Sequence, residues 1–79
     1  MVKLRDISKK DNEIVCNAFV EDCSTPIRLV LDIKSKELAG YEFPRDYEWC
    51  KTHVMYAKRF LISLISKDVI PSEKVIMWY

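Results

Sequence analysis

Glycine is almost missing from this 79-residue sequence, which contains only Gly40. Loops that cradle phosphate groups need several glycines, because their backbone must approach the anion closely and adopt positive φ angles. The sequence therefore excludes nucleotide-binding loops of the glycine-rich kind. With three prolines and 49% hydrophobic residues, the composition also excludes intrinsic disorder, collagen-like repeats and low-complexity tails.

Net charge is nearly absent as well, because 13 Lys and Arg residues are balanced by 12 Asp and Glu residues. The resulting charge of +1 gives no strong field to attract DNA, RNA or anionic lipid. No apolar run approaches the roughly 18 residues of a membrane-spanning helix. We therefore expect no membrane association, and the alternating residues 1–7 do not resemble a signal peptide.

Cysteine is present in an odd number, as Cys16, Cys23 and Cys50, so the thiols cannot all pair. Without an export signal, free thiols in a reducing cytoplasm are the simplest interpretation. We expect a cytoplasmic protein without a cofactor, made of one small domain over residues 1–79. A domain of this size buries a modest share of its surface, so contact with a partner would add useful burial.

Apolar and polar residues alternate in four segments of the first half of the chain, as in strands with one buried face. The residues predicted to face inward are Val2, Leu4, Ile14, Cys16, Ala18, Val20, Ile27, Leu29, Leu31, Ile33, Ala39, Tyr41 and Phe43. A polar turn at residues 9–12 separates the first two segments. The pattern predicts an α+β fold that begins with a four-stranded antiparallel meander.

The third hairpin is constrained by this pattern, because both of its strands must present their apolar residues to the same side. A three-residue loop at residues 34–36 satisfies that condition and pairs Leu29 with Tyr41. Such a loop usually ends in a left-handed residue, normally glycine. Here that position falls to Lys36, at a cost of around 1 kcal/mol.

A long amphipathic helix is predicted from Tyr47 to about Ser66, with Asp46 as its N-cap. Its apolar stripe, which should pack on one face of the sheet, comprises Cys50, Val54, Ala57, Leu61, Leu64 and Ile65, with His53 and Phe60 at its edge. The chain then ends in an apolar strand at residues 75–79. If this strand runs antiparallel beside the first, the strand order is 5-1-2-3-4, which we favour over a parallel crossover beside the fourth strand.

Aromatic residues beside the helical stripe form the first candidate site. Trp49 and Tyr56 are seven residues apart and flank the stripe on the side of His53, and Tyr47 and Trp78 can approach them. One interpretation is that these rings wall a small core. The other is an aromatic groove with His53 as its polar group, suited to a peptide or a partner protein.

A thiol and an imidazole lie three residues apart at Cys50 and His53, and therefore on neighbouring positions of a helix. They could belong to a metal site or to a nucleophilic site. Cys16 and Cys23 do not complete a zinc pattern, and no third group is evident to orient His53. We therefore assign no metal ligand and no catalytic residue, and keep a small enzyme or thiol site as an alternative.

The sheet face that the helix leaves uncovered carries the second candidate site, an apolar patch of Val15, Phe19 and Val30. This patch favours a non-catalytic protein-interaction module, either a homodimer or a subunit of a larger assembly. A further alternative is binding of RNA or a single nucleic-acid strand on the same face, with Phe19 stacking on bases and Arg28 contacting phosphate. The near-zero net charge counts against nucleic acid.

Overall fold

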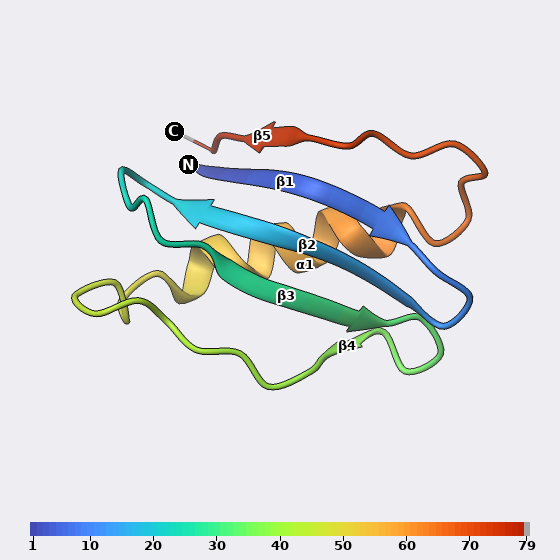
Figure 1. The fold of residues 1–79 in the computed structure, drawn as a ribbon, viewed down its shortest axis with the longest axis horizontal. Coiled ribbons are helices and arrows are strands. Elements are labelled where there is room, and N and C mark those ends of the chain that lie inside the picture. The colour runs from blue at the N-terminus through green and yellow to red at the C-terminus, as the bar shows by residue number, and fades with distance from the viewer. Residues whose placement is uncertain (79) are drawn as a thin grey trace.

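The computed structural model describes residues 1–78 as one antiparallel sheet crossed on one face by a helix (Figure 1). The elements in chain order are β1 (Val2–Lys9), β2 (Glu13–Val20), β3 (Ile27–Asp32), β4 (Glu37–Leu38), α1 (Lys51–Ser63) and β5 (Lys74–Ile76). The order across the sheet is β4-β3-β2-β1-β5. The α+β class and the favoured strand order 5-1-2-3-4 are therefore confirmed.

The core lies between α1 and the face of the sheet that is turned away from the viewer in Figure 1. It is built from the inward-facing side chains of β1, β2 and β3 and from the predicted helical stripe, in which Val54, Ala57 and Leu61 are buried. Burial of these alternating apolar residues is the main force that holds the helix on the sheet. Sequence alternation therefore located most of the core.

β1 contains a bulge that the sequence pattern did not reveal. The β1–β2 pairing shifts by one residue between Arg5 and Ser8, and Asp6 adopts a left-handed φ of 54°. The extra residue turns Ile7 toward the core, where an unbroken alternation from Val2 and Leu4 would have pointed it outward. The same shift turns Lys9, which pairs with the inward-facing Ile14, toward the side of the sheet that α1 covers.

The fourth strand is shorter than predicted and pairs in another register. Leu31 pairs with Leu38, so Leu38 packs against the core and Tyr41 is exposed. The predicted pairing of Leu29 with Tyr41 is therefore wrong. Lys36 does adopt the predicted left-handed conformation, with φ of 60°, but the turn it closes holds one residue more than expected, which shifts the facing residues.

The helix begins later than predicted, at Lys51, and Asp46 is not its N-cap. Asp46 has φ of 70°, which is incompatible with the extended conformation of an N-cap residue. Its carbonyl oxygen instead accepts a hydrogen bond from Trp49 Nε1 at 3.0 Å. Cys50 occupies the N-cap position without a side-chain hydrogen bond, so tertiary contacts must fix this end of the helix.

The last strand is confined to Lys74–Ile76. Tyr79, which the predicted strand included, lies outside the described residues. None of the helical structure in residues 1–78 has the length and hydropathy that crossing a bilayer demands.

Candidate functional site

Four segments distant in sequence meet at one end of the molecule: the start of β1, the end of β2, the start of α1 and the chain after β5 (Figure 1). This meeting follows from the antiparallel order, because β1 starts where β2 and β5 end. It gathers all five residues of the predicted aromatic site. We call these residues, Tyr47, Trp49, His53, Tyr56 and Trp78, the aromatic end.

The five rings of the aromatic end form a continuous chain of contacts. Tyr47 stacks on Trp49 with ring centroids 6.3 Å apart, and Trp49 and His53 meet edge to face with centroids 5.5 Å apart. His53 meets Trp78 at 4.8 Å, and Trp78 stacks on Tyr56 at 4.6 Å with only 10° between the ring planes. Offset-stacked and edge-to-face arrangements of this kind are the favourable ones. The rings are therefore brought together as expected, whereas a groove among them stays a prediction.

His53 is held by a carboxylate that the sequence did not reveal. Its side chain is buried, and its Nε2 donates to Glu21 Oε1 at 2.9 Å. Glu21 also accepts from the amino group of Met1 at 3.2 Å. From the sequence, Glu21 belongs to a solvated turn after β2, and nothing signals its approach to a residue 32 positions later. The contact links β1, β2 and α1.

The second ring nitrogen of His53 has a different environment. Nδ1 is buried and makes no hydrogen bond with any part of the chain in residues 1–78. The edge-to-face rings of Trp49 and Trp78 lie against the imidazole instead. Because a buried polar atom without a partner costs free energy, this nitrogen is a feature that packing alone does not explain.

An imidazole held by a carboxylate also supplies two of the three members of a catalytic triad, which lacks only the nucleophile. The neighbouring thiol is poorly suited to complete it, because Cys50 is completely buried. Burial, together with the negative charge of Glu21, raises the pKa of Cys50 and disfavours the reactive thiolate. In the described part of the chain, no three His, Cys, Asp or Glu side chains gather as metal ligands.

Trp49 is the exposed member of the aromatic end, with 63% of its surface accessible. Its indole nitrogen is bound to the Asp46 carbonyl, and Tyr47 stacks on its ring. Tyr47 is fixed in turn, because its hydroxyl donates to Asp22 Oδ1 at 2.8 Å. This hydrogen bond is the main cause that raises the pKa of Tyr47 to about 12. The exposed indole is therefore held in one orientation.

The predicted patch on the open face, the sheet face that α1 does not cover, is less accessible than its sequence implies. Val15 is only 4% exposed, and Phe19 and Val30 are half-buried. The guanidinium of Arg5 lies 5.7 Å from the centre of the Phe19 ring. Long polar side chains therefore cover part of this apolar surface.

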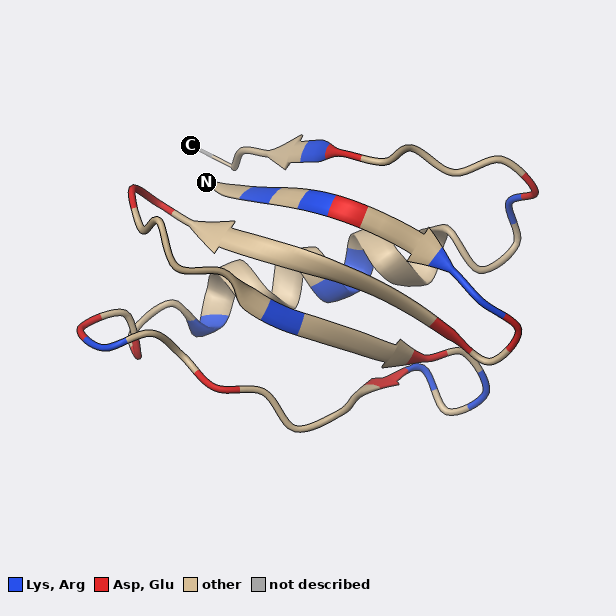
Figure 2. Cartoon of the chain, in the orientation of Figure 1, with Lys and Arg blue, Asp and Glu red and all other residues tan. Residues whose placement is uncertain are grey.

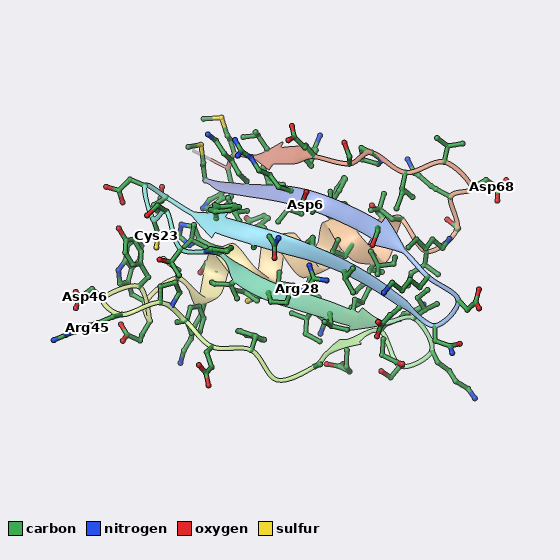
Figure 3. All side chains as sticks on the ribbon, viewed as in Figure 1. Asp6, Cys23, Arg28, Arg45, Asp46 and Asp68 are labelled. Atoms are coloured by element: carbon green, nitrogen blue, oxygen red, sulfur yellow. The ribbon has the colours of Figure 1, made fainter. Side chains whose placement is uncertain are left out.

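A polar chain also crosses the open face. Asn17 Nδ2 donates to Asp6 Oδ2 at 3.1 Å, and Arg28 donates to Asn17 Oδ1 at 3.4 Å. Figure 3 shows Asp6 and Arg28 on β1 and β3, with β2 between them. Figure 2 shows basic and acidic residues next to one another along β1, in agreement with the balanced composition. The face presents no uniform charge to a partner.

Comparison with known proteins gives no family for this chain. No family model matches the sequence, and no curated protein or solved structure matches it either.

Proposed function

We propose that this chain is a small non-catalytic protein-interaction module whose contact surface is the aromatic end. The observation that carries the proposal is Trp49, a largely exposed indole held by the Asp46 carbonyl and by Tyr47. Tryptophan is enriched among the residues that dominate binding free energy at protein interfaces. A ring already fixed in one orientation loses little conformational entropy when a partner covers it.

The contact of Trp49 with His53 supports the same proposal. The buried His53 imidazole meets the indole edge to face, and it is itself held by contacts with Trp78 and with the Glu21 carboxylate. A partner that offers an apolar pocket would therefore meet a preorganised ring. The partner is either a second copy of this chain or a subunit of a larger assembly.

Trp49→Ala tests the proposal, with Met55→Ala as the matched control. Met55 is 57% exposed and lies on α1 outside the aromatic end, so both substitutions remove exposed apolar surface without opening the core. Light scattering reports self-association, and quantitative affinity capture reports other partners. We expect wild type and Met55→Ala to show the same oligomer mass or to capture the same partner protein. Trp49→Ala should lose that oligomer or that partner.

Two results would contradict the proposed surface. One is that wild type, Trp49→Ala and Met55→Ala are all monomeric and capture the same proteins in the same amounts. The other is association that survives Trp49→Ala and is lost in Met55→Ala. Either result would require another function or another surface.

Nucleic-acid binding on the open face stays a prediction with less physical support. Phe19, the proposed stacking residue, is half-buried beneath Arg5, and Arg28 contacts Asn17. Base stacking needs an accessible ring face. Titration of the protein with mixed-sequence oligonucleotides at low salt would test it directly.

A further inference from the structure

The outer edge of β3 is only partly covered by β4. Leu31 and Asp32 pair with β4, and the last contact along this edge is a hydrogen bond of 2.9 Å from Ala39 N to Val30 O. The chain then diverges from β3 over residues 40–44 on its way to α1, as Figure 1 shows. Within residues 1–78, the first half of β3 therefore has β2 on one side and no strand on the other.

The pairing pattern shows which backbone groups this edge leaves open. In an antiparallel sheet the N–H and C=O of one residue point to the same side, and successive residues alternate. The carbonyls of Val30 and Asp32 accept from Ala39 and Lys36, so these residues point toward β4. Arg28 has the same parity. Within residues 1–78, the N–H and C=O of Arg28 and the N–H of Val30 thus face this edge without a backbone partner.

A groove is lined by the residues that carry these open groups. Its volume is about 490 Å³, and it is bordered by Arg28 and Val30 on the β3 side and by Tyr41, Glu42 and Phe43 on the other. The Tyr41 and Phe43 rings pack edge to face, with centroids 5.6 Å apart, and stiffen the outer wall. The groove therefore has a hydrogen-bonding side and a largely aromatic side.

We propose that this groove binds a short extended peptide from a partner protein as an added strand beside β3, with an acidic side chain opposite Arg28. Open N–H and C=O groups at alternate positions recognise an extended backbone, which can return both kinds of hydrogen bond. Pairing with the same edge of a second copy fits less well, because the residues 40–44 that flank the β3 edge of that copy would meet the wall formed by Tyr41 and Phe43.

Arg28 supplies the side-chain preference. Directly opposed residues on neighbouring strands place their side chains on the same face, so the peptide residue paired with Arg28 lies beside its guanidinium. In the described chain, the Arg28 side chain donates to Asn17 and makes no ion pair, although Glu42 also borders the groove. An aspartate or glutamate at the paired position would give Arg28 a charged acceptor.

The test uses a blocked pentapeptide, acetyl-Thr-Val-Asp-Val-Thr-amide, added to the isotope-labelled full chain and followed by NMR. We expect the amides of Arg28 and Val30 to shift and to exchange more slowly with solvent. Arg28→Gln should weaken binding about tenfold, which corresponds to about 1.4 kcal/mol. Lys51→Gln, an exposed charge change on α1, is the control and should leave binding unchanged. A peptide N-methylated at its aspartate should not bind, because its amide can no longer donate.

Several results would overturn the proposal. One is that the amide signals of Arg28 and Val30 do not change at millimolar peptide, or that only signals of other surfaces shift. Another is that Arg28→Gln binds the peptide as tightly as wild type. If the Arg28 and Val30 amides are protected from exchange without peptide, residues 40–43 of this chain already cover the edge. If that protection depends on protein concentration, a second copy covers it. Trp49→Ala should bind the peptide normally, so this proposal and the proposed function can fail separately.

Discussion

The two ends of the molecule are held together in different ways. At the aromatic end, side chains contact side chains: ring meets ring, and the His53 imidazole meets the Glu21 carboxylate. At the other end, which we call the turn end, the β1–β2 turn, the β3–β4 hairpin and the end of α1 come together (Figure 1). There, polar side chains mainly satisfy the backbone.

Lys9 and Asp32 illustrate the turn end. The Lys9 ammonium donates to three carbonyl oxygens that follow α1, those of Leu64, Ile65 and Lys67, at 3.3, 2.6 and 3.0 Å. Asp32 Oδ2 accepts from the backbone N–H of Ser35 at 2.7 Å. Helix ends and turns leave such groups in every fold, so these bonds are explained by stability alone.

The aromatic end contains more than stability requires. It keeps an indole exposed and a buried imidazole nitrogen without a hydrogen bond in the described chain. Both features cost free energy or solubility unless a partner uses them. The contrast supports placing the contact surface at the aromatic end, and four substitutions test it.

The largest expected effect is at His53. His53→Ala removes a buried ring that contacts Trp49, Trp78 and Glu21, and should lower the free energy of unfolding by about 3 kcal/mol. Urea unfolding at neutral pH measures the change. Thr52→Ala, at the exposed neighbouring position, should change it by less than about 0.5 kcal/mol. Equal midpoints for the two variants would mean that the ring contacts contribute little.

At the turn end, Lys9→Met should cost about 1 kcal/mol, because it removes a positive charge from the carbonyl end of α1. The loss should shrink when the unfolding is repeated at high salt, since ions screen this interaction. Lys10→Met is the matched control and should have little effect. If the loss of stability in Lys9→Met does not depend on salt, it results from lost packing and not from the lost charge.

Lys36→Gly should stabilise the turn end by about 0.5 to 1 kcal/mol. The substitution relieves the left-handed strain of a residue with a Cβ, and part of the gain is offset by the greater freedom of glycine in the unfolded chain. Lys34→Gly has the entropic cost without the relief, so its denaturation midpoint should fall. A lower midpoint for Lys36→Gly would show that Lys36 is not strained.

The smallest effect is expected for Asp32→Ala, and it should depend on pH. The hydrogen bond from Ser35 N–H is the main cause that lowers the pKa of Asp32 below its ordinary 3.8. Because the folded pKa is the lower one, the stabilisation is complete above pH 3.8 and is lost as the pH falls through the folded value. The free energy of unfolding of wild type should therefore be higher than that of Asp32→Ala at neutral pH. In acid, the denaturation curves of the two proteins should converge.

The sequence predicted the overall architecture because few physical rules decide it. Alternating residues fixed the inward faces of the first three strands, and the direction of the returning chain favoured β5 beside β1. The aromatic end could be assembled for the same reason, since the strand order brings Trp78 near the start of α1. These inferences need only periodicity and topology.

What the sequence did not reveal depends on single backbone conformations. Asp6, Glu21 and Asp46 all have positive φ without being glycine. Aspartate tolerates this region, but no pattern says which aspartate adopts it. Because of the left-handed turn at Asp46, the helix begins at Lys51 and not at the predicted Tyr47. The turn at Glu21 is where its carboxylate meets His53, a contact that depends on three-dimensional placement alone.

The bulge in β1 has one more consequence, which concerns the tolerance of this strand to deletion. Arg5 pairs with Asn17 and Ser8 with Val15, so Asp6 is the residue in excess over regular pairing. A chain without Asp6 would run from Arg5 directly into Ile7 with an unbroken alternation. Ile7 and Lys9 would keep their present directions. Asp6 can thus be regarded as an insertion into a regular strand, and its contribution is the polar contact with Asn17 on the open face.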